Sequence, residues 1–256
     1  MPRFEYHQFG YGSDNYGVLV HCSETGQTLA IDAGDADRYR EELEQKGWAL
    51  SHILITHHHG DHTEGLSVLA EMTGAVVYGP EGDKPGHEHI THKLADGSSM
   101  TFAGSPIEVI HTPGHTLDML NFYLPDEGVC FTGDTLFALG CGRVFEGDFD
   151  MMWSSLARLM ALPADTVIYC SHEYTQANAA FALSVDPDNQ ALISRADDIK
   201  KMRDKGMPTV PTTLSAELAT NPFLRASDTG LRAHLGLEQA SDAEVFAEVR
   251  RRKDSF

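Results

Sequence analysis

The chain has 256 residues and a formal net charge of −19, with 41% hydrophobic and 22% charged residues. This composition is typical of a globular protein with one large domain or two unequal ones, and it excludes a disordered or fibrous chain. The acidic charge disfavours nucleic-acid binding, and no apolar run approaches the roughly 18 residues of a membrane helix. Because no signal-peptide pattern begins the chain, we expect a cytoplasmic protein. We also expect a monomer without membrane or nucleic-acid partners.

Residues 1–172 alternate short β-rich runs with fewer helical stretches, which predicts an α/β domain. The expected strands are Tyr16–His21, Thr28–Asp32, His52–Thr56, Ala75–Tyr78, Ile107–His111, Met119–Leu124, Val129–Thr132 and Thr166–Cys170. Helices are expected over Ala36–Lys46, from Thr63 to Gly74, and around Trp153–Met160. The apolar run at His52–Thr56 is typical of a strand that is buried on both faces.

From Tyr174 onward the pattern predicts only helices, at Gln176–Ser184, Asn189–Lys205, Ser215–Ala219 and Asp242–Arg252. The charge changes at the same point. Residues 1–172 hold 25 acidic and 8 basic residues, whereas residues 173–256 hold 13 acidic and 11 basic residues. We therefore expect an α/β domain over residues 1–172 and a smaller all-helical domain over residues 173–256.

Histidines concentrate in the segment Thr56–His62 (THHHGDH), directly after the predicted buried strand. Four imidazoles and a carboxylate this close repel one another at low pH and cost desolvation when buried, and a bound metal ion relieves both problems. On an extended segment His57 and His59 share one face, and Gly60 permits a turn that presents Asp61 and His62 elsewhere. The spacing thus favours two ligand pairs over a solvated histidine-rich loop.

Three further candidate ligands stand at the ends of predicted strands, where α/β sheets place their chemistry. They are His115, Asp134 and His172. Each alone is a weak signal, because an aspartate at a strand end is more often a cap or turn residue. Together with the THHHGDH segment they complete five histidines and two aspartates, enough for two metal ions that share a carboxylate.

The other polar clusters give weaker signals. The four cysteines form no CxxC pair, so we expect buried thiols in a reducing compartment. His87, His89 and His92 lie in a polar loop, where we expect solvated side chains. The basic run Arg250–Lys253 ends a predicted helix, where cations complement the helix dipole without any ligand.

With these residues in hand, the chain resembles the metallo-β-lactamase superfamily, through THHHGDH, His115, Asp134 and His172 in this order. The resemblance narrows to the glyoxalase II (hydroxyacylglutathione hydrolase) family through further segments. These are Asp14–Tyr16 (DNY), Gly140–Gly147 (GCGRVFEG), His172–Tyr174 (HEY), Asn221–Arg225 (NPFLR) and Arg250–Asp254 (RRRKD). The histidine motif specifies only the superfamily, whereas the GCGR and RRRKD segments are more selective.

The resemblance implies an αββα sandwich followed by the helical domain, with two divalent metal ions, zinc first and iron or manganese as alternatives. It implies one ion on His57, His59 and His115, a second on Asp61, His62 and His172, and Asp134 as a bridge. It also implies that glutathione is bound by Arg143, Tyr174, Arg250 and Lys253. For Arg250 and Lys253 the resemblance therefore favours ligand binding, whereas their charge alone favours an interaction with the helix dipole and no ligand.

Two positions depart from the family pattern. Phe145 stands where some members have a tyrosine that contacts glutathione, so that hydrogen bond is absent here. After His115-Thr116 the family often continues Leu-Gly-His, but this chain has Leu117-Asp118-Met119. The second change adds a carboxylate near the expected site without removing a metal ligand.

The resemblance implies hydrolysis of an S-(2-hydroxyacyl)glutathione, such as S-D-lactoylglutathione, in methylglyoxal detoxification. We expect a metal-bound hydroxide, held with Asp61 and Asp134, to attack the thioester carbonyl. The first alternative is a glutathione persulfide dioxygenase with a single iron, since two histidines and a carboxylate can hold such an ion. A nuclease of the same superfamily is opposed by the acidic charge, and a non-catalytic binding module by the intact set of seven ligands.

Overall fold

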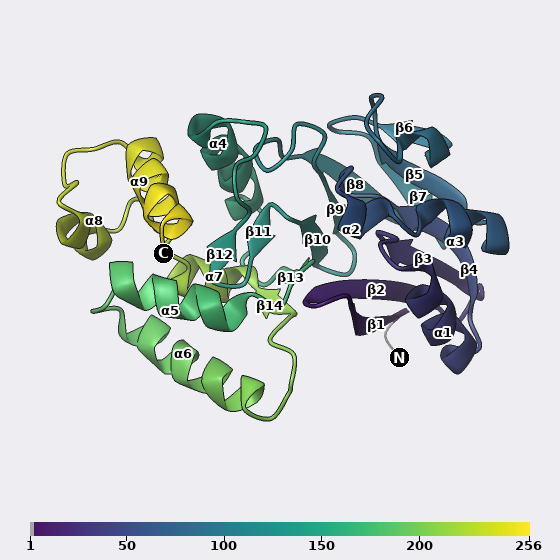
Figure 1. Ribbon diagram of the computed structural model, residues 1–256, viewed down its shortest axis with the longest axis horizontal. Coiled ribbons are helices and arrows are strands. Elements are labelled where there is room, and N and C mark those ends of the chain that lie inside the picture. The colour runs from purple at the N-terminus through teal and green to yellow at the C-terminus, as the bar shows by residue number, and fades with distance from the viewer. Residues whose placement is uncertain (1–2) are drawn as a thin grey trace. The chain divides into compact units, whose positions relative to one another are not determined.

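A computed structural model describes residues 3–256 of the chain (Figure 1). The β-rich half begins with a sheet of six strands. Its strand order follows the sequence, and the first pairs are antiparallel whereas β3 to β6 are parallel. The strands are β1 (Phe4–Tyr11), β2 (Asn15–Cys22), β3 (Gln27–Ile31), β4 (Ala49–Leu54), β5 (Val76–Pro80) and β6 (His92–Leu94).

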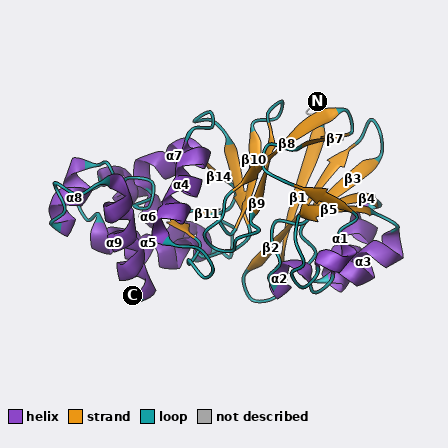
Figure 2. Cartoon of the chain, turned by 90° about the horizontal axis from the view of Figure 1, so that it is seen from above, coloured by secondary structure: helices purple, strands orange, loops and turns teal. Residues whose placement is uncertain are grey.

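Two helices cover one face of this sheet, α1 (Ala36–Lys46) and α3 (Leu66–Thr73) (Figure 2). Tyr39 of α1 and Leu69 of α3 are fully buried against strand residues such as Leu19 and Ile53. Asp35 caps α1, and Gly47 and Gly74 end the two helices in the left-handed conformation that favours glycine. The short elements α2 (Gly60–Thr63) and η1 (His87–His89) lie in the connections.

The chain folds into two compact units, and the first one takes the residues up to His111 together with Asp118–Glu127. Besides the six-stranded sheet it holds the antiparallel strands β7 (Ser99–Phe102), β8 (Ser105–His111) and β9 (Leu120–Leu124). The second unit takes Thr112–Leu117 and Gly128–Phe256. This division differs from the boundary expected at residue 172. The division of function at residue 172, into a metal-binding part and a part that contributes to glutathione binding, stays a prediction.

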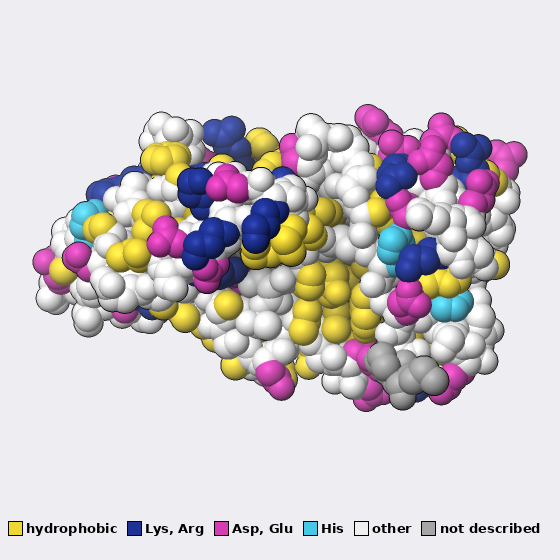
Figure 3. All heavy atoms as spheres, turned by 90° about the horizontal axis from the view of Figure 1, so that it is seen from below, with side chains coloured by type: hydrophobic (Ala, Val, Ile, Leu, Met, Phe, Trp, Pro, Cys, Tyr) yellow, Lys and Arg dark blue, Asp and Glu magenta, His cyan; other side chains and the backbone are white. Residues whose placement is uncertain are grey.

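The second unit combines a few strands with most of the helices. Its strands are β10 (Val129–Gly133), β11 (Leu136–Phe137), β12 (Gly140–Cys141), β13 (Val167–Cys170) and β14 (Thr212–Thr213). Its helices are α4 (Phe149–Met160), α5 (Thr175–Val185), α6 (Gln190–Arg203), α7 (Leu214–Thr220), α8 (Thr229–Leu235) and α9 (Asp242–Asp254). On the face shown in Figure 3, lysine and arginine side chains gather over this helical part, in line with its nearly balanced charge.

The structure confirms the predicted helices and most predicted strands within a few residues. The pattern missed β1, because only Phe4, Phe9 and Tyr11 of its eight residues are buried and the others are half-exposed or exposed. It also missed α8, a seven-residue helix with a glycine at its second position. The strand predicted to reach Thr56 ends at Leu54, because the Thr56 amide donates to the carboxylate of Asp32 instead of a strand partner.

Candidate functional site

The first unit brings together four of the predicted ligands on the loop that follows β4. His57 Nε2 lies 3.1 Å from His59 Nδ1, and His62 Nε2 lies 3.4 Å from an Asp61 carboxylate oxygen. The rings of His57 and His62 are 4.1 Å apart between centroids, and both side chains are fully buried. The segment is extended up to His59 and then turns into α2. The two predicted ligand pairs therefore form one cluster.

Buried oxygens and an amide fix the orientation of this loop. His62 Nδ1 lies 2.8 Å from Asp32 Oδ2, so its Nε2 atom is the one turned toward Asp61. The Asp32 carboxylate also accepts from the amide and hydroxyl of Thr56, and its backbone has a φ of 59°, which is uncommon outside glycine. Asn15 Nδ2 donates to Asp61 Oδ2 over 2.9 Å. Such outer partners hold metal-binding side chains in place.

Neither Asp32 nor Asn15 was predicted from the sequence to be a functional residue. Asp32 ended a predicted strand, and a carboxylate at the end of an apolar strand is itself a signal of a buried polar role. Asn15 fell inside the DNY segment, which served only as evidence of resemblance. No feature of the sequence places either one beside the histidine loop.

The second unit brings together the other three predicted ligands, from three separate segments. One carboxylate oxygen of Asp134 lies 3.4 Å from His115 Nε2 and 3.3 Å from His172 Nε2. All three side chains are buried. The opposite nitrogen of His115, Nδ1, lies 2.7 Å from the carbonyl oxygen of Arg143, which fixes the ring orientation. Asp134 thus stands between two imidazoles.

The donor atoms gathered in each unit, imidazole nitrogens and carboxylate oxygens, are of the kinds that metal ions bind. Ring nitrogens lie 3.3 to 3.4 Å from carboxylate oxygens, and the ring nitrogens of His57 and His59 lie 3.1 Å from each other. His57, His62 and His115 each turn Nδ1 toward a protein oxygen, which leaves Nε2 directed at the cluster. Imidazole held by an outer oxygen, with carboxylate beside it, is the pattern of zinc-like sites. The histidine and aspartate clusters are therefore consistent with metal binding.

Tyr174 lies next to the second ligand cluster. Its ring stacks on His172, with centroids 4.7 Å apart and planes only 2° from parallel. Phe137 meets both rings edge-on, at 5.8 Å from His172 and 5.6 Å from Tyr174. Phe145 is 60% exposed and its ring lies 5.2 Å from His115, so this position presents an apolar ring beside that histidine.

The predicted glutathione-binding cations differ in exposure. The Arg250 guanidinium is buried, donates to the carbonyl of Cys141, pairs with Asp254 and lies over the Phe223 ring. Arg143 is more exposed, and its Nε lies 3.4 Å from Asp254 Oδ1. Lys253 lies over the Phe181 ring, and desolvation, followed by the nearby Arg250 charge, lowers its pKa. Arg250 and Lys253 therefore make specific side-chain contacts in addition to any interaction with the helix dipole.

Asp118, one of the two departures from the family pattern, is buried between two histidines of the same unit. One carboxylate oxygen lies 2.9 Å from His58 Nδ1 and the other 2.9 Å from His87 Nε2. The expectation that His87 is solvated is wrong, because this carboxylate gives a buried imidazole a partner. His89 and His92 are exposed, as expected.

The four cysteines are free and buried, as the sequence predicted. Burial raises the pKa of Cys141 to about 11, although the neighbouring Arg250 opposes the shift. Burial likewise raises the pKa of Cys130 and Cys170. These three thiols are therefore protonated near neutral pH and unsuited to act as nucleophiles.

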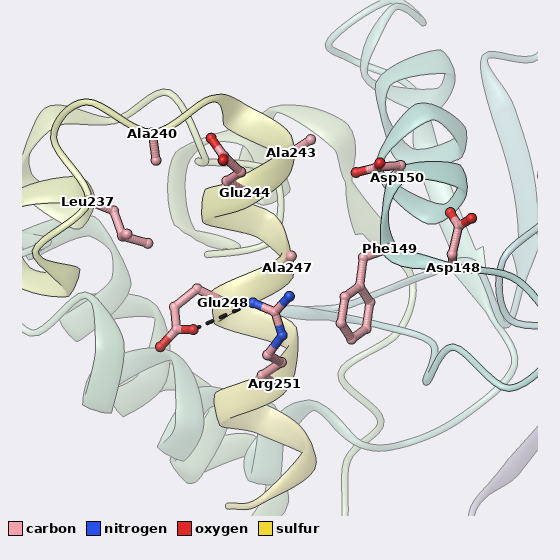
Figure 4. Close-up of a pocket in the computed structure, with 10 residues that line it drawn as sticks. All are labelled: Asp148, Phe149, Asp150, Leu237, Ala240, Ala243, Glu244, Ala247, Glu248 and Arg251. Carbon is pink, nitrogen blue, oxygen red and sulfur yellow. Dashed lines mark ion pairs between the residues drawn. The ribbon is translucent and has the colours of Figure 1, made fainter.

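A cavity of about 560 Å³ between α4 and α9 lies within the second unit and contains none of the predicted site residues (Figure 4). Arg251 crosses it, 3.7 Å from a Glu248 oxygen and over the Phe149 ring. Asp148 and Glu244 on its wall act in helix caps. Arg251 therefore pairs within α9 and packs against Phe149 of α4, which is a structural role.

Two family models together match nearly the whole chain. The metallo-beta-lactamase superfamily matches residues 12–172, and the hydroxyacylglutathione hydrolase C-terminus matches residues 173–256. A hydroxyacylglutathione hydrolase of Rhizobium meliloti is 51% identical over the full length of both chains. One of Brucella ovis is 52% identical over 99% of each chain.

Solved structures agree on the fold. The structure of ETHE1 from Myxococcus xanthus superposes with a TM-score of 0.69 at 24% identity, covering 96% of this chain and 90% of its own. The BLEG-1 B3 metallo-beta-lactamase gives a TM-score of 0.64 at 21% identity, covering 86% and 99%. The predicted fold class, a metallo-β-lactamase sandwich followed by a helical region, is confirmed.

Within residues 3–256, no helix has both the length and the apolar character needed to span a membrane. The full-length identity to curated hydrolases and the two consecutive family matches lead to one assignment. The chain belongs to the hydroxyacylglutathione hydrolase (glyoxalase II) family of the metallo-β-lactamase superfamily.

Proposed function

We propose that this hydrolase cleaves S-(2-hydroxyacyl)glutathione thioesters, such as S-D-lactoylglutathione, to glutathione and a 2-hydroxy acid in methylglyoxal detoxification. The observation that carries the proposal is the pair of ligand clusters, four side chains in one unit and three in the other. We assign His57, His59 and His115 to one divalent ion and Asp61, His62 and His172 to a second, with Asp134 as the bridge. Zinc is our first choice, with iron and manganese as alternatives.

When bound, two such ions lower the pKa of a water molecule toward 7 and polarise the acyl oxygen of a thioester. The protein's part is to hold the ligand atoms ready. Asp32 and the Arg143 carbonyl fix His62 and His115 so that their Nε2 atoms face the carboxylates. Asn15 holds one oxygen of Asp61, which orients that carboxylate before any ion arrives. This arrangement reduces the reorganisation that metal binding and catalysis require.

The leaving group requires little help from the protein. A thiol has a pKa of about 8.5, so the glutathione thiolate leaves with little protonation near neutral pH. Cys130, Cys141 and Cys170 are buried with raised pKa, so they offer no thiolate for a covalent route. Hydrolysis by an activated water is therefore the simplest reaction that these residues support.

For glutathione we propose the aromatic and cationic side chains of the second unit. Tyr174 is 38% exposed and stacked on the ligand His172, so a molecule resting on its ring lies close to the metal ligands. Glutathione carries two carboxylates, which Arg143 and Lys253 can pair with. Arg250 is already engaged with Cys141 and Asp254, and we assign it a binding role from within that network.

The test is an assay of S-D-lactoylglutathione hydrolysis beside elemental analysis of the purified protein. We expect thioester cleavage, loss of turnover after treatment with a chelator, and recovery when zinc is added back. Activity that persists in metal-free protein contradicts the proposed mechanism. One iron per chain, with oxygen uptake on glutathione persulfide and no hydrolysis, decides for the dioxygenase.

A further inference from the structure

The segment Asn221–Arg225 (NPFLR) belongs to neither ligand cluster, yet its first residue is fully buried. Asn221 follows the end of α7, and its amide nitrogen donates to two backbone carbonyls, those of Phe137 over 3.2 Å and Gly140 over 3.0 Å. These two residues pair with each other across the β11–β12 hairpin. One side-chain amide therefore holds both sides of the same tight turn.

Glu217, one turn earlier on α7, holds the tip of that turn. Its carboxylate is fully buried and accepts from the amide of Leu139 over 2.8 Å and from Asn221 Nδ2 over 3.1 Å. Leu139 has a φ of 57°, a left-handed conformation that is unfavourable for a residue with a side chain. On its other side Glu217 forms an ion pair with Arg195. The shape of the turn thus depends on a hydrogen bond from outside the hairpin.

The hairpin in turn contacts the residues proposed to act on the substrate. Phe137, at the start of the turn, lies edge-on against Tyr174 and the ligand His172. The carbonyl of Cys141, on the returning strand, accepts from Arg250 Nη1 over 3.1 Å. Arg250 also lies over the ring of Phe223, whose amide donates to Asn221 Oδ1. A shift of the turn would therefore change the contacts of both Tyr174 and Arg250.

We propose that Asn221 and Glu217 are positioning residues for glutathione binding, a role that rests on the proposed function. They act by fixing the backbone at residues 137–140, which sets Phe137 against Tyr174 and the Cys141 carbonyl against Arg250. The metal ligand His172 is also held by the coordination that we propose for it, so the loss falls mainly on substrate binding. In this proposal the NPFLR segment, which served above only as part of the family resemblance, has a positioning function.

The test compares Asn221→Ala with Asn189→Ala as a matched control. Asn189 makes a similar set of hydrogen bonds in the same unit, to Asp186, the Ala219 carbonyl and the Leu192 amide, and has no bond to the hairpin. Both variants should lower Tm. Only Asn221→Ala should raise the KM for S-D-lactoylglutathione, by about tenfold for a loss near 1.4 kcal/mol, with kcat and metal content little changed.

Calorimetric binding of glutathione itself gives a second readout that needs no turnover, and its Kd should rise by the same factor in Asn221→Ala. Asn221→Ser keeps one hydroxyl donor and should give a smaller change in the same direction, which covers the case of an alanine variant that does not fold. A wild-type KM and Kd in the serine variant, despite a lowered Tm, overturns the proposal. Absence of hydrolysis in the unmodified protein instead defeats the proposed function and leaves the Kd comparison standing.

Discussion

The two units contribute the proposed metal ligands in opposite ways. The first takes its four from one stretch of six residues, and the second takes its three from segments that are far apart in the sequence. The carboxylates of the two clusters also differ in exposure, since the Asp61 side chain is 47% exposed and the Asp134 side chain only 8%. Water can replace an exposed ligand more readily than a buried one. The contiguous cluster should therefore tolerate the loss of a carboxylate better than the dispersed cluster.

The largest expected effect is that of removing the buried carboxylate. Asp134→Asn leaves two buried imidazoles without the anion between them, and we expect kcat/KM to fall about a thousandfold, or roughly 4 kcal/mol. Asp61→Asn is the matched variant in the other cluster and should cost about tenfold to a hundredfold. Steady-state kinetics and elemental analysis of both proteins check the ranking. Equal losses would show that exposure of the carboxylate does not matter.

The next effect concerns the residue that orients His62. Asp32→Asn replaces a carboxylate oxygen that lies 2.8 Å from Nδ1 of this ligand, and such outer partners typically contribute 10–100-fold in metal affinity or activity. Asp35→Asn is the control, because the Asp35 side chain caps α1 by accepting from the Arg38 amide. Metal titration of both variants should show weaker binding only for Asp32→Asn. Equal metal affinity in the two proteins would remove Asp32 from the site.

This contrast also explains what the sequence reveals. The histidine loop was predictable because its ligands are neighbours and their spacing carries the geometry. His115, Asp134 and His172 each follow a strand, but nothing in the spacing says that one oxygen of Asp134 faces both histidines. That fact depends on tertiary packing of separate strands. The resemblance to a family supplied the ligand set, whereas local pattern supplied only candidates.

Buried polar partners were the least predictable part of the fold. Asp118 and His87 look like surface residues in sequence, and they are buried because each supplies the other with a hydrogen-bond partner. Glu217 and Asn221 lie in the last part of α7 and at its end, and their proposed role depends on the hydrogen bonds that they form with the β11–β12 hairpin. A single sequence indicates which residues are polar, but not which of them find one another.

A third prediction concerns Lys253, whose cation we assign to glutathione. Lys253→Ala should raise KM about tenfold with little change in kcat, the pattern of lost uniform binding. Arg252→Ala is the control on the same helix, since Arg252 pairs with Glu248 and is not assigned to the substrate. Because the pKa of Lys253 is lowered by desolvation, its charge is lost as pH rises, before 10.5 is reached. The KM should therefore rise on the alkaline side in the unmodified protein but not in Lys253→Ala.

The smallest effect on catalysis is expected at Asp118, in the first unit but outside the ligand set. Asp118→Asn weakens the bonds to His58 and His87, each 2.9 Å long, and should cost about 1–2 kcal/mol of stability. For a chain of this size that corresponds to a Tm lower by roughly 2–8 °C, while kcat should stay within about twofold. Thermal unfolding and kinetics measure the two quantities separately. A large fall in kcat at full metal content would mean that this carboxylate takes part in the reaction. The first unit would then contribute a further residue to catalysis besides those of its histidine loop.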